Sequence, residues 1–132
     1  MHLASLIYRL PALLYAGLLF WLSSRSRLPF VDLGWGFEDK VAHFGAYAVF
    51  SALIYVALTR PQRRVRHAHV WAVALGALYA LTDEWHQTTV AGRFFEWSDL
   101  IADGGGLVAA QLFLYRLDRW RDRTLRTASR HD

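Results

Sequence analysis

The chain has 132 residues, enough for one domain and too short for two. Hydrophobic residues make up 55% of it and charged residues 20%, whereas soluble domains average about 45–50% and about 25%. The composition therefore favours a membrane protein and excludes a disordered chain, and the lack of cysteine excludes a disulfide framework, a thiol nucleophile and a Cys-ligated zinc site.

Four apolar runs alternate with polar ones along the chain. We expect helices at approximately residues 5–24, 41–58, 68–86 and 99–117, followed by a basic tail at 118–132. Each run is close to the roughly 20 residues that cross about 30 Å of hydrocarbon. The first run could alternatively be a signal peptide, but Ser-Ser-Arg-Ser at 23–26 is a poor cleavage site. We predict an all-α bundle of four transmembrane helices in one domain, residues 1–132.

The distribution of charge predicts the orientation of these helices. With the N-terminus inside, the inner segments hold 11 of the 15 basic residues, and the outer segments hold 8 of the 11 acids. The positive-inside rule then places both termini in the cytoplasm. The basic tail fits contact with anionic lipid headgroups. A nucleic-acid partner is not expected, because only Trp120 interleaves the arginines of that tail.

Polar side chains mark the outer ends of the last three helices. Lys40, His43 and Tyr47 share one face of the second helix. Near the end of the third helix, Gln87 lies three residues after Glu84 and four after Asp83.

The connector and the fourth helix add further charge at the same level. Arg93 lies in the connector, and Asp99 and Asp103 lie on adjacent turns of the fourth helix. Ionisable residues in a membrane are costly and usually face the interior of a bundle, where they mark functional sites. We therefore predict one outward-facing polar site built from these groups.

The order of these residues resembles that of the VanZ-like family of small bacterial membrane proteins, named after a teicoplanin-resistance factor. The matching elements are Lys40-x-x-His43-x-x-x-Tyr47, Glu84-x-x-Gln87, Gly92-Arg93, Ser98-Asp99 and a Gly-rich fourth helix. The resemblance covers about residues 39–107 and implies a protein of the bacterial inner membrane linked to the cell envelope and to glycopeptide tolerance. One departure is Asp103, where the family usually has Asn, and it adds a negative charge to the site.

Several of these residues also have a purely structural interpretation. Glu84 and Arg93 could form an ion pair that holds the connector, although an arginine paired in this way can still accept a phosphate. His43 could hydrogen-bond to Glu84 or to Asp99. The glycines at 104–106 favour close helix packing, and a broken helix with amides exposed to an anion is the alternative.

A hard cation is the weaker interpretation of the acidic residues. Asp99 and Asp103, with Glu84 or His43 opposite, are plausible oxygen and nitrogen ligands. Lys40 and Arg93 would compensate these acids without any ion, so we predict no metal; the sequence leaves the identity of any cofactor unknown.

The leading functional hypothesis is a binding protein. Its ligand would be a membrane lipid, a lipid-linked envelope precursor or a glycopeptide, with Lys40 and Arg93 on an anionic headgroup. The remaining ligand-binding candidates are His43, Tyr47, Glu84, Gln87, Asp99 and Asp103.

Three other functions remain open. In a membrane-embedded hydrolase or transferase, Glu84 or Asp99 would be the general base, His43 its acid/base partner, and Arg93 would stabilise developing negative charge. A structural accessory protein would use the same cluster only to hold its helices together. Transport is disfavoured, because four helices without an internal repeat are few unless the protein forms an oligomer.

Overall fold

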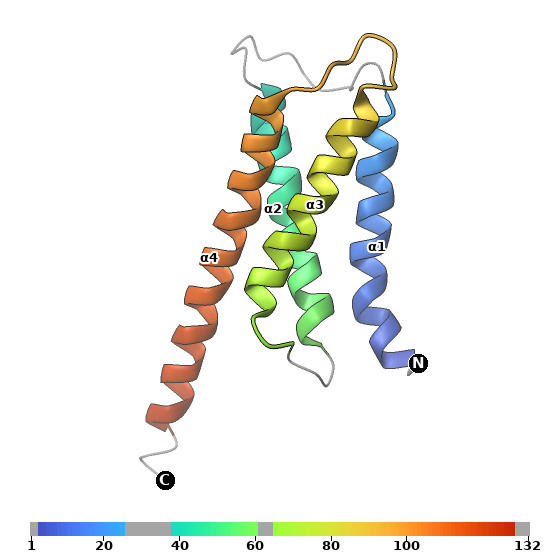
Figure 1. The fold of residues 1–132 in the computed structure, drawn as a ribbon. Coiled ribbons are helices and arrows are strands. Elements are labelled where there is room, and N and C mark those ends of the chain that lie inside the picture. The colour runs from blue at the N-terminus through green and yellow to red at the C-terminus, as the bar shows by residue number, and fades with distance from the viewer. Residues whose placement is uncertain (1–2, 26–37, 61–64, 129–132) are drawn as a thin grey trace.

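The computed structural model describes residues 3–25, 38–60 and 65–128. The four helices are α1 (Leu3–Ser23), α2 (Glu38–Thr59), α3 (Ala68–Gln87) and α4 (Trp97–Ala128). They run alternately up and down as a bundle, and the start of α1 and the end of α4 lie at the same end of it (Figure 1). The predicted all-α fold with four helices is confirmed.

Two helix boundaries differ by three residues or more from the expected ones. α2 begins at Glu38, and Glu38 and Asp39 occupy its first turn, where negative charge favours the positive end of the helix dipole. α4 continues to Ala128, so most of the expected basic tail is helical. Arginine is among the better helix formers, and the Arg-rich segment therefore extends the helix rather than ending it.

Three helices are long and apolar enough to cross a membrane, over Leu6–Ser23, Glu38–Thr59 and Trp97–Arg126. α3 has 20 residues and is not among them in the described part of the chain. It carries the polar residues His69, Asp83 and Glu84, which lower its hydropathy.

The outer surface of the bundle is strongly apolar. Leu13 and Leu14 of α1 are 64% and 65% exposed, and Phe113 of α4 is 68% exposed. Soluble monomers rarely expose large contiguous apolar patches, so this surface fits a lipid environment.

The closest helix packing joins α2 to α4 and depends on glycine. A Cβ atom at Gly106 would collide with the carbonyl oxygen of Phe44 and lie 3.0 Å from the backbone nitrogen of Ala48. α4 is continuous through residues 104–106. The close-packing interpretation is therefore confirmed for Gly106 and not for Gly104, around which there is open space, and the broken helix is not observed.

Polar groups near the middle of the bundle satisfy one another. The amide of Gln111 donates to the carbonyl and the hydroxyl of Ser51, at 2.9 and 2.8 Å. Its oxygen lies 2.9 Å from Nδ1 of His69. These bonds tie α4 to α2 and to α3.

Candidate functional site

The predicted site residues meet at one end of the bundle. This end holds the connector between α3 and α4 (residues 88–96) and lies opposite the start of α1 and the end of α4 (Figure 1); we call it the connector end. Five polar side chains there are at most 6% exposed, namely Asp83, Glu84, Gln87, Asp99 and Asp103. The structure thus places these groups together, and their role toward a ligand remains a prediction.

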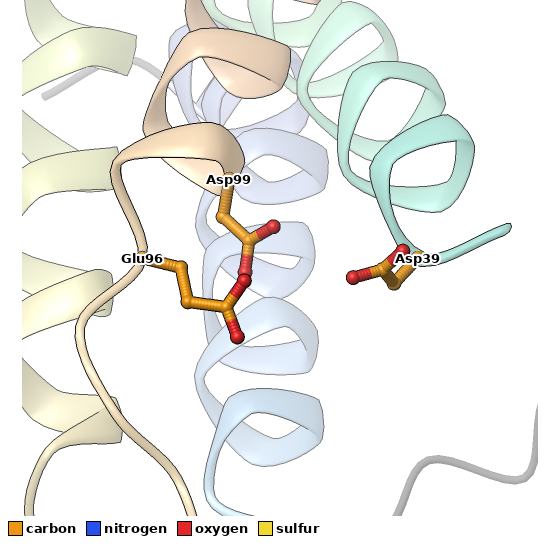
Figure 2. Close-up of side chains that lie close together, drawn as sticks. All are labelled: Asp39, Glu96 and Asp99. Carbon is orange, nitrogen blue, oxygen red and sulfur yellow. The ribbon is translucent and has the colours of Figure 1, made fainter. Parts of the chain in front are cut away.

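Lys40 lies among three carboxylates. Its Nζ is 2.7 Å from Asp39 and 2.8 Å from Glu96, and it forms a further ion pair with Asp99. Figure 2 shows the three acids, which come from α2, the connector and α4. The hydrogen bond and positive charge of Lys40 hold the pKa of Glu96 below its usual value.

These three acids also lie close enough together to hold a metal ion, since their ligand atoms are within 4.8 Å of one another. Among the described residues they form the one cluster of this kind. The Lys40 ammonium already supplies positive charge there, so the cluster requires no cation. Lys40, predicted to bind an anionic headgroup, thus also contacts three acids of its own chain, and its role toward a ligand stays a prediction.

His43 lies between two aspartates of α4. Its Nδ1 is 2.9 Å from Asp103, and its Nε2 is 3.7 Å from Asp99. The expected alternatives were a bond to Glu84 or to Asp99, and the shortest contact is instead to Asp103. The residue that departs from the family pattern is therefore the main partner of the imidazole.

Glu84 anchors the connector through a backbone contact. Its Oε1 accepts a hydrogen bond of 2.6 Å from the N–H of Glu96. Arg93 donates to the side-chain oxygen of Gln87 and, at 3.5 Å, to the carbonyl of Arg25. The Glu84–Arg93 ion pair considered from the sequence does not form between these two described residues.

A cavity of about 50 Å³ opens beside this network, between α1, α2 and α3. Its lining includes the apolar side chains of Leu19, Leu22, Ala42 and Ala46 and the polar side chains of Ser23, His43, Tyr47, Asp83, Gln87 and Arg93. The combination of apolar walls and a few convergent polar groups is typical of small-molecule sites.

Asp83 is a member of this lining that the sequence placed in the polar cluster but not among the ligand-binding candidates. Its Oδ2 accepts a hydrogen bond of 3.3 Å from Tyr47, whereas its Oδ1 is buried without a partner among the described residues. Asp83 lies four residues before Gln87 and therefore shares its helix face. This spacing is the feature of the sequence that could have identified Asp83 as a residue of the site. The lack of a partner emerges only from the packing.

Comparison with known proteins gives one match. The model of the VanZ/LLP1 family matches residues 10–118, a segment that contains every predicted site residue. No curated protein and no solved structure matches the chain.

Proposed function

Because the chain belongs to the VanZ/LLP1 family of membrane proteins, we propose that it binds the headgroup of a lipid, a lipid-linked envelope precursor or a glycopeptide-type ligand at its connector end. The observation that carries this proposal is the cavity between α1, α2 and α3. It combines apolar walls with Arg93, Gln87 and Asp83, which matches a ligand with a polar head and an apolar tail.

Arg93 is the group best placed to contact an anionic part of the ligand. In the described structure its guanidinium makes bonds to Gln87 and to a backbone carbonyl. A guanidinium has five N–H donors and suits bidentate recognition of phosphate or carboxylate. Gln87 therefore orients Arg93 while leaving donors for a ligand.

The proposed orientation places the connector end at the outer face of the bacterial inner membrane and both termini in the cytoplasm. Exposed arginines at the opposite end of the bundle support it. Arg60 follows α2, Arg66 precedes α3, and four more lie in the last third of α4, namely Arg119, Arg121, Arg123 and Arg126. α3 would span the membrane as well, because its acids Asp83 and Glu84 are buried inside the bundle.

The geometry favours binding over hydrolysis or group transfer. His43 lies close to two aspartates, as a general acid/base residue could. However, both of its ring nitrogens face these carboxylates, and Glu84 is engaged by a backbone N–H. Neither Glu84 nor Asp99, the candidate general bases, lines the cavity, so His43 is the predicted catalytic residue that faces it.

Native mass spectrometry of the full chain in mild detergent tests the proposal. We would compare wild type, Arg93→Ala, Glu84→Gln and the control Arg119→Ala, which removes an exposed arginine at the opposite end. Lipid retained by wild type and by the control, and lost from folded Arg93→Ala, supports the headgroup site. Bare protein in every sample contradicts it.

The Glu84→Gln variant separates a binder from an enzyme. Gln keeps an oxygen that can accept the Glu96 N–H bond, so the connector should stay in place. A binder retains the same lipid in wild type and Glu84→Gln. An enzyme converts the lipid in wild type and accumulates it unreacted in the variant.

We extend the proposal to glycopeptide tolerance, which rests on the family resemblance. Expression of the wild-type chain in a susceptible bacterium should raise the inhibitory concentration of teicoplanin, and expression of Arg93→Ala should not. An equal rise in the inhibitory concentration with both chains would show that tolerance does not depend on the proposed site.

A further inference from the structure

The unpartnered oxygen of Asp83 shows which chemical group is missing from the cavity. Asp83 is 6% exposed, and its Oδ1 is the buried side-chain nitrogen or oxygen that lacks a hydrogen-bond partner among the described residues. Buried polar atoms are nearly always paired, because an unpaired one carries the full cost of desolvation. The contact of Tyr47 with the other oxygen, at 3.3 Å, is long.

The other acids of the connector end already have donors. Lys40 contacts Asp39, Glu96 and Asp99, His43 contacts Asp103, and a backbone N–H contacts Glu84. The cation that shares the cavity with Asp83 is Arg93, and it donates to Gln87.

Carboxylates therefore outnumber cations at this end. Among the described residues, seven acids lie at this end, Glu38, Asp39, Asp83, Glu84, Glu96, Asp99 and Asp103, against the cations Arg25, Lys40 and Arg93 and the imidazoles of His43 and His86. An added positive charge would be stabilised most beside Asp83, because the Oδ1 of Asp83 is a hydrogen-bond acceptor without a donor among the described residues.

We propose that Asp83 binds the primary ammonium group of a zwitterionic headgroup whose phosphate contacts Arg93. This inference rests on the proposed function and names the ligand class of the same site. The class is an ammonium–phosphate ester, and phosphatidylethanolamine is its commonest lipid form.

The volume and the apolar walls of the cavity favour a primary ammonium group on a lipid over the other ammonium–phosphate esters. At about 50 Å³ the cavity holds roughly three to five water-sized groups, which suits an aminomethyl group. A quaternary ammonium is bulkier and has no N–H to donate to Oδ1. Leu19, Leu22 and Ala42 line the cavity with apolar surface, which suits the adjoining methylenes and favours a lipid over a freely soluble ligand.

The test measures headgroup preference with defined lipids. Delipidated full-length protein in detergent would be offered phosphatidylethanolamine, its N-monomethyl and N,N-dimethyl forms, phosphatidylcholine and phosphatidylglycerol, all with the same acyl chains. Native mass spectrometry would report occupancy for wild type, Asp83→Asn and the control Asp122→Asn, an exposed acid of α4 at the opposite end.

Wild type should prefer phosphatidylethanolamine over phosphatidylcholine by about tenfold or more, the scale of a charged hydrogen bond. Occupancy should fall as N–H groups are replaced by methyls. Asp83→Asn should lose this preference and still bind phosphatidylglycerol through Arg93, and Asp122→Asn should behave as wild type. The methylation series in wild type keeps the test valid if Asp83→Asn fails to fold.

Other outcomes separate this inference from the proposed function. Equal retention of phosphatidylglycerol, phosphatidylcholine and phosphatidylethanolamine overturns the ammonium site and leaves lipid binding intact. No retention of any lipid by wild type overturns both. If soluble phosphoethanolamine displaces the lipid at equal concentration, the site recognises the ammonium–phosphate group and its ligand is a soluble molecule. If soluble phosphoethanolamine does not displace the lipid, the ligand is the lipid.

Discussion

Several buried or half-buried charges at the connector end have a partner on a different element. Lys40 of α2 forms ion pairs with Glu96 of the connector and Asp99 of α4. His43 of α2 contacts Asp103 of α4. Glu84 of α3 receives a backbone N–H of the connector. Since removing one partner of such a pair leaves the other uncompensated, the contribution of each residue can be tested by conservative and non-conservative changes at the same position.

Lys40→Met should destabilise the protein, and Lys40→Arg should largely preserve its stability. The Met variant leaves Asp39, Glu96 and Asp99 without their shared cation. Because the cluster is partly open to solvent, the expected loss at pH 7 is about 2 kcal/mol, between the values for exposed and buried pairs. Thermal unfolding in detergent measures it.

This loss should depend on pH in a defined direction. Lys40 lowers the pKa of Glu96 in the folded state, so its stabilising effect is fully present above the ordinary glutamate pKa of about 4.3 and disappears as the pH falls through the lowered folded value. The gap in stability between wild type and Lys40→Met should therefore be constant from about pH 6 to about pH 9 and narrow below about pH 4. A gap that stays the same at pH 3.5 and pH 7 would contradict the ion-cluster interpretation.

Asp103→Asn should be tolerated, and Asp103→Leu should not. The oxygen of Asn can accept from Nδ1 of His43 as the carboxylate does, so we expect stability within about 1 kcal/mol of wild type. Leu leaves a buried imidazole nitrogen without its partner, for an expected loss of about 2 kcal/mol. Thermal unfolding of both variants in the same detergent provides the comparison; equal losses would show that the charge of Asp103, and not its acceptor, is required.

At the scale of the helices, the contact between α2 and α4 positions the site. It brings Lys40 and His43 to Asp99 and Asp103, and it depends on the absence of a side chain at Gly106. The glycine two residues earlier, Gly104, has open space around the position of a Cβ. The two glycines therefore form a matched pair for testing the interface.

Gly106→Ala should destabilise the bundle by about 1–3 kcal/mol, because the added methyl meets the Phe44 carbonyl and forces α2 and α4 apart. Gly104→Ala should be neutral or slightly stabilising, because alanine is the better helix former. Unfolding curves of the two variants measure the difference. Equal stability would mean that the two helices can separate without loss.

The sequence was sufficient to predict the four helices and the end of the bundle where the polar groups meet. Four apolar runs joined by short connections must alternate in direction, so the end of the third helix and the starts of the second and fourth share one end. Spacing along a helix also fixed which side chains share a face, as for Lys40 and His43.

The individual pairings could not be predicted in the same way. Helical spacing does not specify the rotation of one helix against its neighbour, so the sequence could not place Lys40 among Asp39, Glu96 and Asp99, or direct His43 to Asp103. Nor could it show that Glu84 would accept a backbone N–H instead of pairing with Arg93. The open acceptor of Asp83 depends on all of these contacts at once.

At the scale of the whole molecule, the two ends differ in charge and the sides are apolar. Acids dominate the connector end, and the described arginines of the α2–α3 connection and of α4 after Leu117 lie at the other. Exposed apolar side chains such as Leu13, Leu14 and Phe113 lie between these ends. A membrane that follows the positive-inside rule would admit this bundle in one orientation, with the connector end outward.

Single cysteines can test that orientation, because the chain contains no cysteine of its own. Thr88→Cys labels an exposed position at the connector end, and Thr124→Cys labels an exposed position near the end of α4. In right-side-out membrane vesicles, a membrane-impermeant maleimide should modify Thr88→Cys and should reach Thr124→Cys only after the membrane is permeabilised. The reverse pattern would place the cavity at the cytoplasmic face, where a glycopeptide could not reach it and only a lipid of the inner leaflet could supply the headgroup.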